Sequence, residues 1–325
     1  MAGAGLELPR GFSGTLRVVR GETVACQAAA GACEAGTGAP CTPDTRFQIA
    51  SVSKQFTATA ALLLAEEGRL TLDAPIAHWL PGCPAAWQHL TLHQLLSHTA
   101  GLGHWQDIPG FHVSRPGHAD DVLDQLSKVP LRNVPGREWY YSSPGYLLVA
   151  RVVERIAGQP YADFVTERIL RPLGMRSTCV GAAPSDTLAY GHRNGRRVYA
   201  PEFAALPGPG DVWSTVGDLH RFTAARTSST LLGAGSSMAL VTPHARLPRE
   251  HGTDGPATAD SYGYGYCLGT LAGHPAYFHH GDNPGYQSFL ARLPDLDVTL
   301  AVLCNDEAAD IDALLWRLEA VLAGG

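Results

Sequence analysis

Lysine is almost absent from this chain of 325 residues, because only Lys54 and Lys128 occur among its 24 basic residues. The 30 acidic residues outnumber the basic ones and give a formal net charge of −6. No stretch gathers basic side chains into the patch that a nucleic-acid-binding surface needs, so we expect no nucleic-acid partner. A serine three residues before one of only two lysines is also a spacing that chance rarely produces.

The chain also lacks a long apolar run. Its longest one, residues 58–65, contains a threonine and is far shorter than the roughly 20 residues that a membrane-spanning helix needs. Residues 1–20 contain Pro9, Gly11 and Gly14 and have no continuous apolar stretch behind a basic start, so they do not resemble a signal peptide. If Met1 is the natural start, we expect a cytoplasmic protein without a membrane partner.

Patterns for disulfides, metals and nucleotides are missing as well. The seven cysteines are odd in number and include no C-x-x-C pair, which favours reduced thiols over a disulfide framework. No H-E-x-x-H, G-x-S-x-G, Walker or G-x-G-x-x-G motif occurs. We therefore predict no metal and no cofactor. The minority alternative is a metal-dependent hydrolase that uses histidines such as His89, His93, His98, His104, His112 and His118.

Strand-like segments occur at both ends of the chain and helical ones between them. Strands are expected at residues 14–20, 23–29, 264–271, 276–280, 287–293 and 298–304, and helices at 51–70, 146–157, from 214 onwards and at 311–322. This order predicts an α+β fold, in which N- and C-terminal strands form one antiparallel sheet flanked by helices. Residues 1–70 plus 210–325 would form the sheet lobe and 71–209 a mostly helical inserted lobe, with the active site at the seam.

Ser51 and Lys54 are candidates for a nucleophile and its base. Ser51 begins a predicted helix and Lys54 follows one turn later on the same face. A serine hydroxyl needs a neighbouring base, and a lysine serves as one only when burial or a nearby positive charge lowers its pKa. The apolar residues after Lys54 make its burial plausible. Taken alone, the pattern favours a helix-capping serine and a solvated surface lysine over a catalytic pair.

Further segments resemble one family in the same order. Residues 47–57 (FQIASVSKQFT) are similar to the nucleophile segment of the serine β-lactamase and penicillin-binding protein superfamily. The likeness continues at 95–102 (LLSHTAGL), 135–146 (PGREWYYSSPGY), 214–219 (STVGDL) and 279–286 (HHGDNPGY). The nearest branch comprises class C β-lactamases, DD-peptidases, esterases and transacylases. The resemblance implies that fold, with Ser51 as nucleophile and Lys54 as proton carrier.

The resemblance implies two more motifs. Tyr141 stands where the tyrosine of Tyr-x-Asn belongs and would share protons with the lysine and the serine, while Ser143 replaces the asparagine that helps to hold an amide substrate. His279 and Gly281 stand where Lys-Thr-Gly or its His-x-Gly variant belongs. Strand alternation puts both on one face and the Asp282 carboxylate on the other, beside His280 or an arginine. The expected oxyanion hole is the backbone N–H of Ser51 and of Asp282.

These residues predict a serine acyl-enzyme hydrolase or acyltransferase for a small-molecule ester or amide, without a cofactor. Its partners are an acyl donor and either water or an amine or alcohol acceptor. Substrate contacts are expected from Ser143, His279 and Gly281, with Trp213, Trp105 and Tyr286 as cleft walls or core residues. A cytoplasmic location and the loss of a fixed positive charge at His279 favour an esterase or biosynthetic transacylase. The alternatives are a D-amino-acid amidase or peptidase, a β-lactamase, and a binding protein without catalysis.

Overall fold

The computed structural model of the protein describes residues 7–34, 36–112, 117–183, 188–198, 206–248 and 255–323. Its main feature is an eight-stranded sheet in the order β10-β11-β12-β13-β14-β15-β1-β2, with every pairing antiparallel. The strands are β1 (Gly14–Arg20), β2 (Thr23–Ala30), β10 (Ala245–Arg246), β11 (Ala257–Tyr262), β12 (Cys267–Leu271), β13 (His274–Asn283), β14 (Tyr286–Leu293) and β15 (Val298–Cys304). The predicted α+β class, with a sheet made from both ends of the chain, is confirmed.

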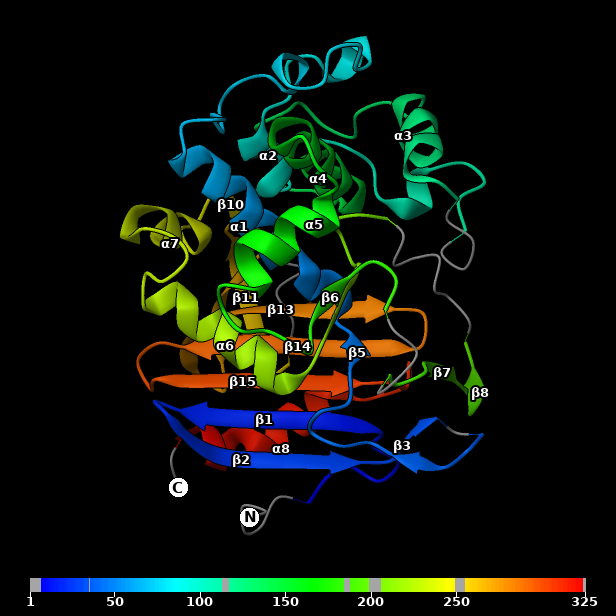
Figure 1. Ribbon diagram of the computed structural model, residues 1–325, viewed down its shortest axis with the longest axis vertical. Coiled ribbons are helices and arrows are strands. Elements are labelled where there is room, and N and C mark those ends of the chain that lie inside the picture. Colours follow the sequence, from blue (N-terminus) through cyan, green and yellow to red (C-terminus); the bar gives the residue numbers. More distant parts are fainter. Residues whose placement is uncertain are drawn as a thin grey trace.

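Helices cover both faces of this sheet (Figure 1). On one face, α8 (Ile311–Ala323) buries leucines against strands from both ends of the chain. On the other face lie α1 (Ser53–Glu66) and α6 (Val216–Thr227), which share one hydrophobic core with the helices above them. Because β15 is covered on both sides, all of its residues are buried. Apolar side chains at consecutive positions, with no polar alternation, are the expected sequence of such a strand.

The upper part of the molecule in Figure 1 is mostly helical. It contains α2 (Leu92–Leu96), α3 (Ala119–Ser127), α4 (Ser143–Ala157) and α5 (Tyr161–Val165), with α7 (Ala234–Leu240) beside α1. Short strands complete the fold: β3 (Ala32–Glu34) with β4 (Ala39–Pro40), β7 (His192–Arg193) with β8 (Arg196–Arg197), and β5 (Phe47–Gln48) and β6 (Cys179–Val180) on either side of β9 (Val212–Ser214). Among the described residues, no helix is long and apolar enough to cross a membrane.

Helix α4 shows how local sequence sets an element that leads to the site. Ser142 caps it, because the Ser142 hydroxyl accepts the backbone N–H of Gly145 at 3.1 Å, and Pro144 suits the first turn. Gly158 ends it in the left-handed conformation, with φ of 72°. The helix therefore begins at Ser143, three residues before the predicted start, and Tyr141 lies directly before its cap.

Candidate active site

Ser51 lies in a short 3₁₀ turn, Ala50–Val52, that leads into α1. The preceding residue, Ala50, is fully buried and has a φ of 47°, a left-handed conformation that residues with a Cβ rarely adopt. Contacts on both sides hold this turn: the Ser288 hydroxyl donates to the carbonyl of Ile49 at 2.7 Å, and the Val212 N–H donates to the Ser53 hydroxyl at 3.1 Å. Backbone strain of this kind persists where the surroundings fix it, often at functional sites.

Lys54 reaches back from α1 to Ser51. Its Nζ lies 2.9 Å from the Ser51 Oγ and donates a second hydrogen bond to the carbonyl of Pro209, also at 2.9 Å. The side chain is completely buried, and this burial lowers the pKa of Lys54 well below its ordinary value, while Asp211 acts in the opposite direction. A lysine whose pKa is lowered in this way is better able to accept the serine proton.

Tyr141 is the third member of the arrangement. The Lys54 Nζ lies 4.9 Å from the centre of its ring. Burial raises the pKa of Tyr141, and hydrogen bonds with the Ser51 and Ser143 side chains oppose this rise. The phenol is therefore neutral and in hydrogen-bonding contact with the nucleophile. Its position depends on His98, whose ring lies 4.4 Å from the tyrosine ring and whose Nδ1 accepts the Ser142 N–H at 3.1 Å.

Ser143 stands at the first turn of α4 and borders the same cavity as Tyr141. Its backbone N–H donates to the Nδ1 of His104 at 3.1 Å. Burial lowers the pKa of His104 to about 4, so this ring is neutral at physiological pH and can accept that hydrogen bond. The sequence predicts His104 to be a surface or core-loop histidine, with metal binding as the minority alternative, because nothing in its neighbourhood indicates that it fixes the start of α4.

Strand β13 forms another wall of the site. His279, Gly281 and Asn283 are buried while His280 and Asp282 are exposed, so the predicted alternation is present. The His279 Nδ1 contacts the carbonyl of His280 at 2.5 Å, and its Nε2 lies 3.0 Å from the Tyr262 hydroxyl. Because a carbonyl only accepts, Nδ1 carries the hydrogen and Nε2 accepts from the tyrosine. Burial lowers the pKa of His279 to about 3.

His279 therefore offers a substrate neither a positive charge nor a free nitrogen. The sequence predicts both the missing fixed charge and a substrate contact at this residue. The structure places the His279 ring at the cavity but engages both of its nitrogens with the protein. Tyr262, which accounts for one of these contacts, lies on β11, a strand that the sequence analysis missed.

Gly281 packs directly on the nucleophile turn. A Cβ at this position would lie 2.1 Å from the Ser288 Oγ and 2.4 Å from the carbonyl oxygen of Ile49. Only glycine leaves room for this approach of β13 to the turn. The pairing of β12 with β13 ends at Cys267↔Phe278. Within the described ranges, the residues of β13 after Phe278 therefore have no strand partner on that side. A strand edge next to the nucleophile is therefore left for other groups.

Gly281→Ala is expected to lower both stability and activity. The added methyl group must push β13 away from the Ile49 carbonyl, and overpacking of this kind costs about 1–3 kcal/mol. Urea unfolding and ester hydrolysis measure the two effects. The control is Gly235→Ala in α7, where a Cβ would meet nothing within 4 Å. Unchanged stability and activity in Gly281→Ala would show that this close approach does not matter.

The other expected contacts have mixed outcomes. The Asp282 carboxylate does point away from His279, and its charged neighbours are Glu307 and Arg193, whereas His280 interacts with Asp312. Trp213 and Tyr286 are not among the residues that border the cavity. Their rings meet edge to face at 5.6 Å in a small cluster with Leu188, so they are packing residues. Of the two expected roles, cleft wall or core residue, Trp213 and Tyr286 therefore both have the second.

The site opens into a cavity of about 750 Å³. Ser51, Tyr141, Ser143 and His279 border it, as do Trp105 and Phe111, whose rings stack at 4.8 Å. Arg193 and Glu307 also border it and form an ion pair of 2.8 Å. The cavity is large enough for a small molecule with groups on both sides of a scissile bond.

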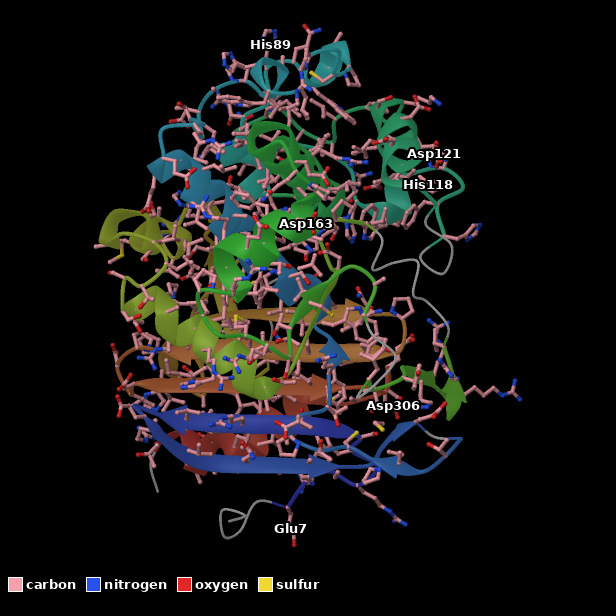
Figure 2. All side chains as sticks on the ribbon, viewed as in Figure 1. Glu7, His89, His118, Asp121, Asp163 and Asp306 are labelled. Carbon is pink, nitrogen blue, oxygen red and sulfur yellow. The ribbon has the colours of Figure 1, made fainter. Side chains whose placement is uncertain are left out.

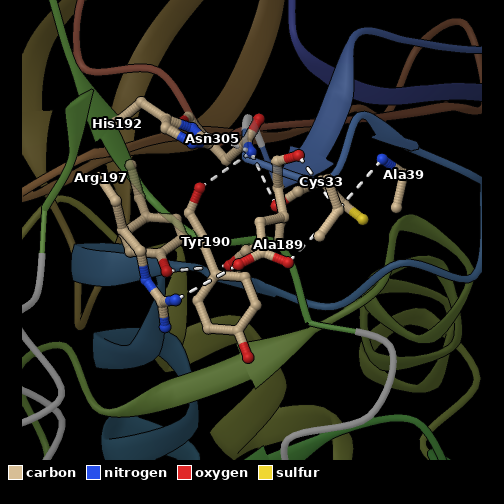
Figure 3. A network of polar contacts seen from close by, with 10 residues as sticks. Cys33, Ala39, Ala189, Tyr190, His192, Arg197 and Asn305 are labelled. Atoms are coloured by element: carbon tan, nitrogen blue, oxygen red, sulfur yellow. Dashed lines mark hydrogen bonds and ion pairs between the residues drawn. The ribbon is translucent and has the colours of Figure 1, made fainter. Parts of the chain in front are cut away.

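Asn305 holds the segment that carries Arg193. Its Nδ2 donates to the carbonyls of Tyr190 and Ala32, both at 3.0 Å, and its Oδ1 accepts from the Ser13 hydroxyl at 2.8 Å. Figure 3 shows Asn305 between the two segments it joins. No motif in the sequence indicates this role, because each of these partners precedes Asn305 by more than a hundred residues.

The metal alternative has no structural support in the described part of the chain. Figure 2 shows His89 at the top of the helical part and His118 on its flank. No group of three or more histidine, cysteine, aspartate or glutamate side chains is arranged to hold a metal ion among the described residues. All seven cysteines lie in this part of the chain, and each is free.

Comparison with known proteins agrees with this geometry. Residues 10–324 match the profile of the Beta-lactamase family, so the chain belongs to the beta-lactamase family of serine hydrolases. It is 30% identical over 341 residues to Penicillin-binding protein 4* of Bacillus subtilis (96% of this chain, 73% of that one), and 35% identical over 195 residues to Esterase EstB of Burkholderia gladioli (55% and 50%).

A solved structure gives the same fold. D-amino acid amidase from Ochrobactrum anthropi SV3, complexed with L-phenylalanine, superimposes with a TM-score of 0.82 at 27% identity, covering 97% of this chain and 93% of that one. The chain is therefore a beta-lactamase-fold serine hydrolase, and its relatives include penicillin-binding proteins, an esterase and an amidase.

Proposed function

We propose that the protein forms an acyl-enzyme on Ser51 from an ester or amide of a small molecule and passes the acyl group to water, an amine or an alcohol. One observation carries this proposal. The Lys54 Nζ lies 2.9 Å from the Ser51 Oγ in a fully buried position that lowers the pKa of the lysine. This arrangement gives a serine its base without a histidine.

In the proposed cycle, the Ser51 oxygen attacks the carbonyl carbon while its proton passes to Lys54, with Tyr141 in the same hydrogen-bonded group. The backbone N–H groups of Ser51 and Asp282 are the proposed oxyanion hole. The proton then goes to the leaving group, and the acyl-enzyme is resolved when an acceptor attacks, with the same residues acting in reverse.

The charges around the cavity favour an ester over a substrate that is held by its carboxylate. His279 is neutral, and Arg193 is already paired with Glu307, beside the exposed Asp282. Ser143 also replaces the asparagine that would hold an amide. The similarity to EstB supports an esterase or transacylase, and that to the amidase supports hydrolysis of a D-amino-acid amide as the second candidate.

Intact-mass spectrometry of the protein with a panel of acyl donors tests the proposal. The panel contains p-nitrophenyl esters of increasing chain length, D- and L-phenylalanine amide, and a penicillin, each with and without an added amine. We expect an acyl adduct and turnover with the esters, and faster turnover with the amine if the protein is a transacylase. Absence of any adduct in the folded protein would support the non-catalytic binding alternative, and loss of turnover on chelation the metal alternative.

The cytoplasmic location and a biosynthetic role stay predictions. Fractionation of the source cells, with antibody detection of the protein, measures the location directly. Recovery of the protein outside the cytoplasmic membrane would favour a cell-wall or β-lactam substrate over a cytoplasmic metabolite.

A further inference from the structure

The turn before β9 holds a carboxyl group that the cycle above does not use. Asp211 is 1% exposed. Its Oδ1 accepts the N–H of Gly208 at 3.0 Å, and the carbonyl of Pro209 in the same turn accepts the hydrogen bond from the Lys54 Nζ. The carboxyl group and the amine are therefore held by one short segment of backbone.

This turn is fixed to the nucleophile segment as well. Val212, the residue after Asp211, donates its N–H to the Ser53 hydroxyl at 3.1 Å and accepts the N–H of Ile49 at 3.0 Å. These bonds lie on both sides of Ser51 in the sequence. Asp211 consequently keeps a constant position relative to both Ser51 and Lys54.

Burial lowers the pKa of Lys54, and Asp211 is the charged group that raises it. Burial in turn raises the pKa of Asp211 to about 7, and the positive charge of Lys54 opposes that rise. The other titratable groups that face this pair from neighbouring elements are His98, His104, His279, Tyr141, Tyr146, Glu154 and Tyr161.

Most of these neighbours are uncharged. Burial lowers the pKa of the three histidines and raises the pKa of the three tyrosines, so all six stay neutral at physiological pH. Glu154 forms an ion pair with Arg151 at 2.8 Å. Among the described residues, Asp211 is thus the one group placed to compensate a positive charge on Lys54.

We propose that the Asp211 carboxylate is the counter-charge for the ammonium that Lys54 becomes when it takes the Ser51 proton. This inference rests on the proposed function of Lys54. In the step concerned, the Ser51 O–H bond breaks, a Lys54 N–H bond forms, and the Ser51 oxygen bonds to the acyl carbon. Asp211 exchanges no atom and is a positioning residue that acts through Lys54.

The scarcity of lysine allows a direct test. With ¹³C-labelled lysine, the side-chain spectrum contains signals from Lys54 and Lys128 only, and the side chain of Lys128 is 68% exposed and serves as the reference. Asp211→Asn keeps an oxygen for the Gly208 N–H but removes the charge. We expect the titration midpoint of Lys54 to fall by about one pH unit or more. An unchanged midpoint would overturn the inference. If Asp211→Asn does not fold, Asp211→Ser must show the same shift.

The pH profile of ester hydrolysis gives the second readout. Losing the counter-charge makes Lys54 a weaker base, so Asp211→Asn should lower the plateau of kcat/KM by about tenfold and move the acidic limb to lower pH. Asp218→Asn is the matched control, because Asp218 is also buried but binds the Ser177 N–H and the Thr178 hydroxyl.

Asp218→Asn should leave the acidic limb of the kcat/KM profile at the same pH as in wild type. A lower plateau in Asp211→Asn with an unmoved limb would show a merely structural role and contradict the inference. The two readouts also separate the two proposals. If wild-type protein formed no acyl adduct, the proposed function would fail, while the lysine titration would still report whether Asp211 and Lys54 are coupled.

Discussion

Ser51→Ala is expected to reduce turnover of an activated ester by roughly 10⁴-fold or more and to abolish the acyl adduct. The variant lacks the oxygen that lies 2.9 Å from the Lys54 Nζ, and no covalent intermediate can form without it. Ester hydrolysis measures the rate, and intact mass after treatment with a fluorophosphonate measures the adduct.

Ser53→Ala is the control for this experiment. Ser53 is buried two residues further along, and its hydroxyl accepts a backbone N–H from Val212. Its loss should lower stability and leave the fluorophosphonate adduct intact. Labelling of Ser51→Ala at the wild-type rate would place the nucleophile at another residue.

Lys54→Met is expected to lower kcat/KM by about 10²–10⁴-fold while the protein stays folded. The replacement has a similar length and no charge, so it removes the base from a completely buried position without leaving a void. Hydrolysis of a p-nitrophenyl ester gives the rate. Lys128→Met tests the other lysine, which pairs with Asp124 at the protein surface, and should hydrolyse the ester like wild type.

The same variant has a signature in stability. Because burial lowers the pKa of Lys54 in the folded state, there is a pH range in which the unfolded chain binds a proton at this residue and the folded chain does not. In that range the stability of wild type decreases as the pH falls. Lys54→Met lacks this contribution, so its stability relative to wild type should increase as the pH is lowered. Urea unfolding at several pH values measures the difference, and a constant difference would contradict a lowered pKa of Lys54 in the folded state.

The order of elements could be predicted from the sequence where local patterns decide it. The two N-terminal strands and β15 lie where apolar residues and turn residues place them, and Gly158 ends α4 as expected. The start of β12 was predicted three residues early, at 264 rather than Cys267. Strand β11 was missed, because its sequence ATADSY has little of the aromatic and β-branched character of a strand.

The chemistry of the site was predictable in part. Ser51, Lys54 and Tyr141 occur in recognisable motifs, and the structure brings their side chains together. Asp211 was not found, since an aspartate after Gly-Pro-Gly is typical of an exposed turn. Its burial comes from tertiary packing, which also places it in electrostatic interaction with Lys54 on α1, Glu154 near the end of α4 and Tyr161 on α5. The packing roles of Trp213 and Tyr286 likewise follow from contacts across the fold.

The sheet also determines when the site around Ser51 can be assembled during synthesis of the chain. Strand β1 pairs with β15, in a register that joins Gly14 to Cys304, and β13 packs Gly281 onto the turn that carries Ser51. A chain still emerging from the ribosome already contains Ser51 and Lys54 but lacks the strands that position them. The growing polypeptide therefore cannot hold Ser51 and Lys54 in this arrangement until β13, β14 and β15 have been translated.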